Sequence, residues 1–171
     1  MTIGGVSYAV METSDSSGGA WVEVLNGPVG LRCWWADPLT CRDDIDAKSF
    51  TNRVYIVLPE VFGVNAWVRS VADRLAAHGC PALAVPLFAR TAPALELAYE
   101  PSDLAEGRRH KDATTTEQIL SDVAAALDWL RTRHPAAAIH VVGFCFGGHA
   151  AFLAATLPGV EHAFDFYGAG V

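Results

Sequence analysis

Residues 139–154 constrain the fold more than any other stretch of this sequence. A short apolar run at 139–142 leads into a glycine-rich turn at 143–148, and small residues suited to a closely packed helix follow up to Ala154. This order predicts a buried strand, a sharp turn and a helix in direct succession. Units of this kind build α/β proteins around a parallel sheet.

The spacing Gly143-x-Cys145-x-Gly147 is typical of a nucleophile elbow in which cysteine takes the place of serine. The central residue of such a turn has a strained backbone, and its neighbours are glycines because a Cβ would collide with the adjacent strand or helix. Cys145 would lie at a helix N-terminus, which favours a thiolate, and the Phe146 N–H would point toward an oxyanion. The alternative is a structural cysteine in an ordinary glycine-bearing turn.

Strands and helices are predicted to alternate from residue 54 onward. Residues 54–58 form a continuous β-branched and aromatic run, typical of a strand buried on both faces, and further strands are expected at 81–85, 139–142 and 162–167. A helix capped by Asn65 should end at Gly79. Alternation of this kind predicts a doubly wound, mostly parallel sheet.

A second helix is expected from a capping box formed by Thr114 and Glu117, with one apolar face. That face consists of Ile119, Val123, Leu127 and Leu130. The helix after the elbow should end at Pro158-Gly159.

The whole chain, residues 1–171, is predicted to form one domain, with residues 1–20 as a loosely ordered N-terminal segment. An antiparallel hairpin is expected from 21–25 and 30–35 around the turn Asn26-Gly27-Pro28, followed by a surface connection at 37–52. Residues 86–113, with three prolines, are predicted to be a long excursion that covers a site.

A formal net charge of −7 argues against binding to nucleic acid or to an anionic membrane surface. The basic cluster at 108–111 is expected to be a solvated loop. No apolar run reaches the length of a membrane span and no signal peptide is evident, so a cytoplasmic protein is expected. The four cysteines form no C-x-x-C pair, and nothing calls for a disulfide framework, a metal or an organic cofactor.

The predicted strands place several chemically useful residues at one edge of the sheet. In doubly wound sheets the active crevice lies outside the carboxyl ends of the strands. Glu60, Arg90, Cys145 and Tyr167 lie at or just beyond those ends in the predicted element order.

Four segments together resemble the dienelactone hydrolase family of α/β-hydrolases. They are the turn at 143–148, Pro59-Glu60-Val61-Phe62-Gly63-Val64-Asn65, Leu87-Phe88-Ala89-Arg90 and Phe166-Tyr167-Gly168. With the element order, the resemblance covers most of residues 50–171. It implies an α/β-hydrolase sheet that lacks its C-terminal part, and a hydrolase acting on small-molecule esters or lactones.

The resemblance also implies roles for individual residues. Cys145 would be the nucleophile, and the backbone N–H groups of Val61 and Phe146 would form the oxyanion hole. Glu60 would hydrogen-bond the cysteine and help to deprotonate it when substrate arrives. Arg90 would pair with a substrate carboxylate, although the segment before it is one residue shorter than the family's pattern and lacks an aspartate.

The base and the acid of a triad have no clear candidates in this chain. Downstream of Cys145 only His149, His162 and Asp165 are available, and none of them suits the role: His149 lies on the elbow helix, which carries it away from the thiol, and the other two lie in a strand. Deacylation needs a base that activates water. We expect the histidine and the aspartate to lie beyond residue 171 or on a partner chain.

Three alternatives remain open at this level. The chain could be a catalytically incomplete hydrolase-fold domain that binds a small acid or a partner protein, or a redox-responsive thiol protein whose Cys145 is reversibly oxidised. A sheet edge left open after the last strand also predicts a homodimer or a second chain that covers it.

Overall fold

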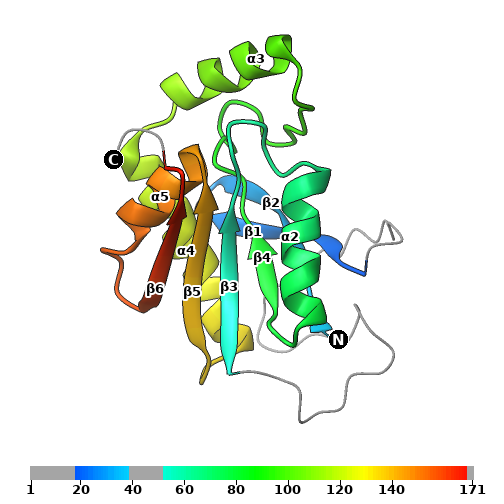
Figure 1. Cartoon of the computed structure of the whole chain (residues 1–171). Coiled ribbons are helices and arrows are strands. Elements are labelled where there is room, and N and C mark those ends of the chain that lie inside the picture. The colour runs from blue at the N-terminus through cyan, green and yellow to red at the C-terminus, as the bar shows by residue number, and fades with distance from the viewer. Residues whose placement is uncertain (1–17, 39–51, 169–171) are drawn as a thin grey trace.

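A computed structural model of the protein describes residues 18–38 and 52–168, and Figure 1 shows their arrangement. Their strands form one six-stranded sheet in the order β1-β2-β4-β3-β5-β6. Helix α2 covers one face, α4 and α5 cover the other, and α3 lies across the end of the sheet to which the parallel strands point. This is the α/β architecture that the sequence predicts.

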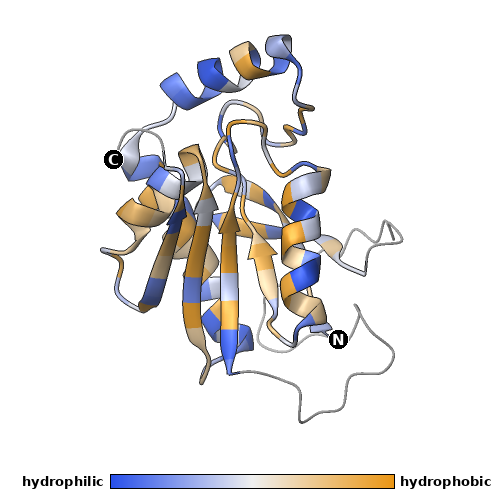
Figure 2. Ribbon diagram, viewed as in Figure 1, coloured by the Kyte–Doolittle hydropathy of each residue, from blue (hydrophilic) through white to orange (hydrophobic). Residues whose placement is uncertain are grey.

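The parallel part of the sheet consists of β3 (Arg53–Leu58), β4 (Ala82–Ala84), β5 (Ala138–Phe144) and β6 (Val160–Phe166). β3 pairs in parallel with both β4 and β5, and β5 pairs in parallel with β6. The residues that follow these strands therefore meet at one edge. β3 and β5 are largely apolar in Figure 2 because both of their faces pack against other elements.

The predicted hairpin is present as β1 (Ala20–Asn26) and β2 (Val29–Ala36), joined by a two-residue turn. Gly27 has a φ of +58°, a conformation that glycine adopts without strain. β2 pairs antiparallel with β4 and so attaches the hairpin to the parallel strands. Residues 1–17 of the predicted N-terminal segment, and 39–51 of the predicted surface connection, lie outside the described residues.

Three helices pack on the faces of the sheet, namely α2 (Ala66–Ala77), α4 (Thr116–Arg133) and α5 (Phe146–Ala154). The Asn65 side chain accepts a hydrogen bond from the Val68 N–H and caps α2, as predicted. The predicted apolar face of α4 is buried in the larger of two core clusters. No helix in the described ranges combines the length and the apolar character needed to span a membrane.

Helix α3 (Pro101–Asp112) lies within the long excursion predicted for residues 86–113 and is a helix that the sequence pattern does not predict. Glu100 caps it through a capping box with Asp103, and Pro101 is its first residue. The basic residues at 109–111 lie in its last turn, where cations interact favourably with the helix dipole, so the predicted solvated loop is wrong. The polar composition of the segment hid the helix, because α3 has a single buried residue, Gly107.

Several element boundaries also differ from those predicted. The capping box of α4 is formed by Thr115 and Gln118, one residue later than the predicted pair. Helix α5 ends at Ala154 rather than at Pro158-Gly159. β4 is shorter than predicted and β6 begins two residues earlier.

Candidate active site

Cys145 occupies a sharp turn between β5 and α5, and its backbone has the conformation expected of an elbow. Its φ of 53° and ψ of −116° lie in a region that non-glycine residues rarely adopt. The turn is held because the Cys145 N–H donates to the Phe166 carbonyl at 3.0 Å. The Gly148 N–H donates to the Cys145 carbonyl at 2.9 Å. Cys145 is the N-cap residue of α5 and is partly exposed.

Glycine is required two residues before and two residues after Cys145, because backbone atoms of other residues lie very close to both positions. A Cβ at Gly143 would collide with the carbonyl of Gly147, and a Cβ at Gly147 would collide with the carbonyls of Leu58 and Pro59. The elbow therefore packs directly against the end of β3. This contact confirms the predicted steric role of the two glycines and brings the Glu60 turn beside the elbow.

Glu60 follows β3 and is held by tyrosines from two other segments. The Tyr99 hydroxyl donates to its Oε2 at 3.0 Å, and the Tyr167 hydroxyl donates to its Oε1 at 3.5 Å. Among the described residues, no hydrogen bond joins Glu60 to the Cys145 thiol. The tyrosine partner before α3 was missed at sequence level, because nothing in the local pattern of 95–100 indicates its distant contact.

The two tyrosines share the electrostatic environment of Glu60. Partial burial raises the pKa of Tyr167, and the nearby Glu60 and Cys145 raise it further. Burial likewise raises the pKa of Tyr99, and its hydrogen bond to Glu60 acts in the same direction. Tyr167 also has a positive φ of 44°, which turns the chain just after β6. Glu60, Cys145 and both tyrosines thus form one cluster at the carboxyl ends of the strands.

The two predicted oxyanion-hole residues, Val61 and Phe146, are both buried. Val61 belongs to the Glu60 turn, and α3 approaches it so closely that a Cβ at Gly107 would collide with the Val61 carbonyl. Phe146 is the first residue of α5, so its N–H has no acceptor within that helix. Its ring stacks on Phe88 with centroids 5.8 Å apart.

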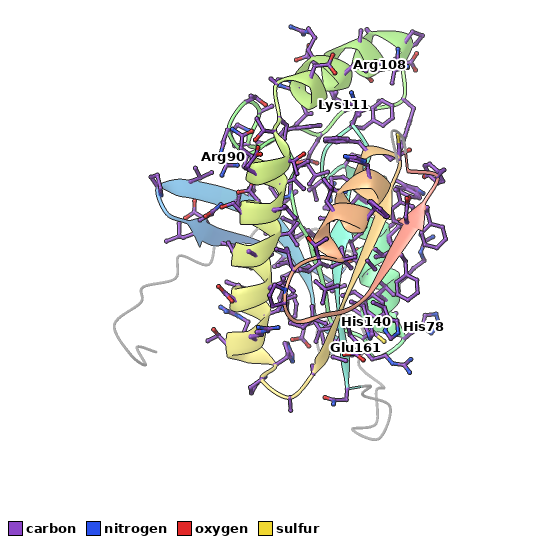
Figure 3. All side chains as sticks on the ribbon, turned by 90° about the vertical axis from the view of Figure 1, so that its left-hand side faces the viewer. His78, Arg90, Arg108, Lys111, His140 and Glu161 are labelled. Carbon is purple, nitrogen blue, oxygen red and sulfur yellow. The ribbon has the colours of Figure 1, made fainter. Side chains whose placement is uncertain are left out.

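Positive charge approaches the elbow from α3. The Lys111 ammonium lies 6.0 Å from the centre of the Phe146 ring. Figure 3 shows Lys111 and Arg108 on α3 at the same end of the molecule. The contact between the ammonium group and the ring is long, and Lys111 also forms an ion pair with Asp112 at 2.9 Å. Lys111 therefore acts on the elbow mainly through its positive electrostatic field.

Arg90 lies just beyond β4, as predicted, and both of its terminal nitrogens bind Asp122. Nη1 donates to Oδ2 at 2.6 Å and Nη2 to Oδ1 at 3.0 Å. Asp122 lies on α4, is 1% exposed, and accepts a further hydrogen bond from Asn26 at 2.7 Å. These contacts give Arg90 a structural partner. Its predicted role toward a substrate carboxylate stays a prediction.

The downstream histidines and aspartate lie where the sequence predicts, and no described contact links them to Cys145 as an acid–base pair. The His149 ring stacks on Phe146 within α5. Asp165 faces α5, and its carboxylate lies where Cβ atoms at Gly148 or Gly168 would stand. His162 stacks on His140 of β5, and Figure 3 shows His140 at the end of the molecule opposite to α3.

A surface cavity adjoins the Glu60 cluster. It has a volume of about 460 Å³ and is lined by Asn65, Ala66, Trp67, Arg69, Glu96, Leu97, Ala98 and Tyr99. A second cavity, of about 490 Å³, lies between β1 and α4 and is lined by none of the predicted site residues. Across the described ranges, no group of three or more His, Cys, Asp or Glu side chains is arranged to hold a metal ion.

The sequence profile of the dienelactone hydrolase family matches residues 45–171 of this chain. "Putative carboxymethylenebutenolidase" of Synechocystis is 40% identical over 120 residues, which cover 69% of this chain and 49% of that protein. Carboxymethylenebutenolidase of Pseudomonas putida is 33% identical over 124 residues, which cover 69% of this chain and 51% of that protein. The chain thus spans about half the length of these relatives.

Solved structures give the same assignment. The "Putative Dienelactone Hydrolase" from Klebsiella pneumoniae superposes with a TM-score of 0.71 at 26% identity, covering 90% of this chain and 60% of that one. An α/β serine hydrolase of Xanthomonas campestris superposes with a TM-score of 0.54 at 19% identity, covering 80% of this chain and 55% of that one, and supports the fold alone. From its sequence match, its sheet and its strained elbow, we conclude that this chain belongs to the dienelactone hydrolase family.

Proposed function

We propose that this protein takes part in the hydrolysis of an activated carboxylic ester or lactone through an acyl-thioester on Cys145. The observation that carries the proposal is the elbow, which holds a partly exposed thiol at φ 53° on a helix N-terminus. Membership of a family whose relatives include carboxymethylenebutenolidases supports the class of reaction.

Acylation uses groups that this chain supplies. The Cys145 thiolate attacks the carbonyl carbon, and the N–H groups of Val61 and Phe146 receive the developing oxyanion. When the adduct collapses, the carbon–oxygen bond to the leaving group breaks, and the leaving alkoxide or enolate takes up a proton. A thiolate is a better leaving group than an amine, so the adduct of an amide tends to revert. Activated esters and enol lactones are the better substrates.

Deacylation requires a base that removes a proton from water as the water attacks the thioester. The histidines downstream of Cys145 do not supply it, because His149 packs on Phe146 and His162 packs on His140 at the far end of the sheet. We propose that this base and its acid partner come from polypeptide outside the described residues or from a partner chain. A single acylation event is therefore the step expected of the described site alone.

The surroundings of the site support a substrate that is mainly apolar and carries negative charge. The cavity beside Tyr99 is walled by Trp67, Leu97 and Tyr99, and α3 brings Lys111 near the elbow. Arg90 is the family's candidate for the substrate carboxylate, but in this structure it binds Asp122. Loss of activity in an Arg90 variant would therefore need a stability control before it is assigned to binding.

The test is to treat the protein with p-nitrophenyl acetate and to follow both nitrophenolate release and the mass of the protein. We expect a burst of nitrophenolate, one acetyl group on the peptide that contains Cys145, and neither in Cys145→Ala. Full turnover by Cys145→Ala would overturn the proposal. Binding of a small acid without acetylation would favour a catalytically incomplete binding domain, and reversible sulfenate formation without acetylation would favour a redox role.

A further inference from the structure

Both carboxylate oxygens of Glu60 face tyrosine hydroxyls from segments distant in sequence. The Tyr99 hydroxyl lies 3.0 Å from Oε2, which is an ordinary hydrogen-bond length, whereas the Tyr167 hydroxyl lies 3.5 Å from Oε1, at the limit for a hydrogen bond. Tyr99 is therefore the main donor to this carboxylate.

Tyr99 is fixed in place by contacts with the turn that carries Glu60. Its ring meets the Phe62 ring edge-on, with centroids 4.6 Å apart. The loop before α3 is attached to the same turn, because the Leu97 N–H donates to the Phe62 carbonyl at 2.9 Å. The Asn65 amide donates to the Leu97 carbonyl at 3.1 Å. The hydroxyl is thus aimed at Glu60 by packing on residues adjacent to it.

Tyr99 remains a hydrogen-bond donor at neutral pH. Burial is the largest effect and raises the pKa of the Tyr99 hydroxyl. The hydrogen bond with Asn65 lowers this pKa, and the neighbouring Glu60 raises it. Tyr99 also lines the cavity of about 460 Å³, so a ligand in that cavity touches the residue that holds Glu60.

We propose that Tyr99 is the positioning residue for Glu60, and that its hydroxyl holds the carboxylate in a fixed orientation beside the elbow. This inference rests on the proposed acyl-thioester chemistry of Cys145 and on the role that the family resemblance implies for Glu60, which is to assist deprotonation of that cysteine. Removing the hydroxyl frees the rotamer of the carboxylate, so that Glu60 is less often in place to receive the proton of the Cys145 thiol. Cys145 should then react more slowly with an alkylating reagent at neutral pH. The difference should vanish in alkaline solution, where hydroxide takes the proton instead.

The experiment measures the rate of Cys145 alkylation by iodoacetamide as a function of pH, for the wild type and for Tyr99→Phe. Peptide mass spectrometry follows Cys145 separately, because the chain has three other cysteines. We expect alkylation of Cys145 in Tyr99→Phe to be roughly threefold slower than in the wild type at neutral pH, with equal rates in alkaline solution. Superimposed profiles would overturn the proposal and leave Tyr99 as a packing partner of Phe62.

Three further variants make the result specific. In a Glu60→Gln background the Tyr99→Phe change should have no further effect on the rate of alkylation; an equal loss of rate there would show that the hydroxyl acts on another group and would overturn the proposal. Tyr167→Phe should give a smaller loss of rate, because its contact with Glu60 is longer. Tyr55→Phe, on β3 beside His140, should give none. Alkylation needs no turnover, so this outcome is independent of whether acetylation by p-nitrophenyl acetate succeeds.

Discussion

Arg90 and Asp122 form an ion pair that joins three separate parts of the chain. The arginine follows β4, the aspartate lies on α4, and Asn26 from the hairpin turn donates to the same carboxylate. Asp122 is 1% exposed, so its charge depends on these donors for compensation. A residue that resembles a substrate-binding arginine is here also a structural one.

Replacing Arg90 by methionine should lower the free energy of unfolding by about 3 kcal/mol, because it leaves a buried carboxylate without its cation. Urea unfolding followed by tryptophan fluorescence measures this loss. The double variant Arg90→Met/Asp122→Leu should recover most of it, and Arg108→Met on the exposed face of α3 is the matched control. An Arg90→Met protein as stable as the wild type would contradict this structural role.

The β5–elbow–α5 unit depends on contact between backbones rather than between side chains. Gly147 lies directly against the carbonyls of Leu58 and Pro59, so the elbow and the Glu60 turn are held together at closest approach. A side chain at position 147 fits only if β3 and α5 move apart. That separation would also pull Cys145 away from Val61.

Gly147→Ala should therefore destabilise the protein by about 3 kcal/mol through overpacking. Gly27→Ala in the hairpin turn is the matched control, because a Cβ there meets nothing within 4 Å and only the positive φ of +58° is strained. Its expected cost is about 1 kcal/mol. Both are measured by urea unfolding, and equal losses at the two positions would show that close approach at the elbow is unimportant.

In the molecule as a whole, β6 forms one edge of the described sheet and carries exposed aromatic rings. Phe164 is 43% and Phe166 49% exposed, on the face where His162 stacks against His140. Burial lowers the pKa of His140, and neither of its ring nitrogens has a hydrogen-bond partner within the described residues. β6 is an edge strand that contains neither proline nor lysine, and such a strand can pair with a strand of another chain.

We propose that two copies of the described chain pair along β6 in solution. Antiparallel pairing centred on Phe164 places aromatic rings opposite one another and sets no two carboxylates face to face, since Glu161 would oppose Tyr167. Light scattering should give a dimer for the wild type and a monomer for Phe164→Lys. Leu25→Lys, on the opposite edge strand β1, should remain dimeric. A monomeric wild type would contradict the proposal.

The sequence by itself determined the strand–turn–helix unit at Cys145, the hairpin and the alternating strands and helices, because these follow from local sterics and hydrophobic periodicity. It did not reveal α3, since a helix with one buried residue carries no apolar pattern. Only the tertiary structure brought Tyr99 to Glu60 and Asp122 to Arg90. Each pair lies more than thirty residues apart in sequence, and its partners meet because the parallel strands end at one edge of the sheet.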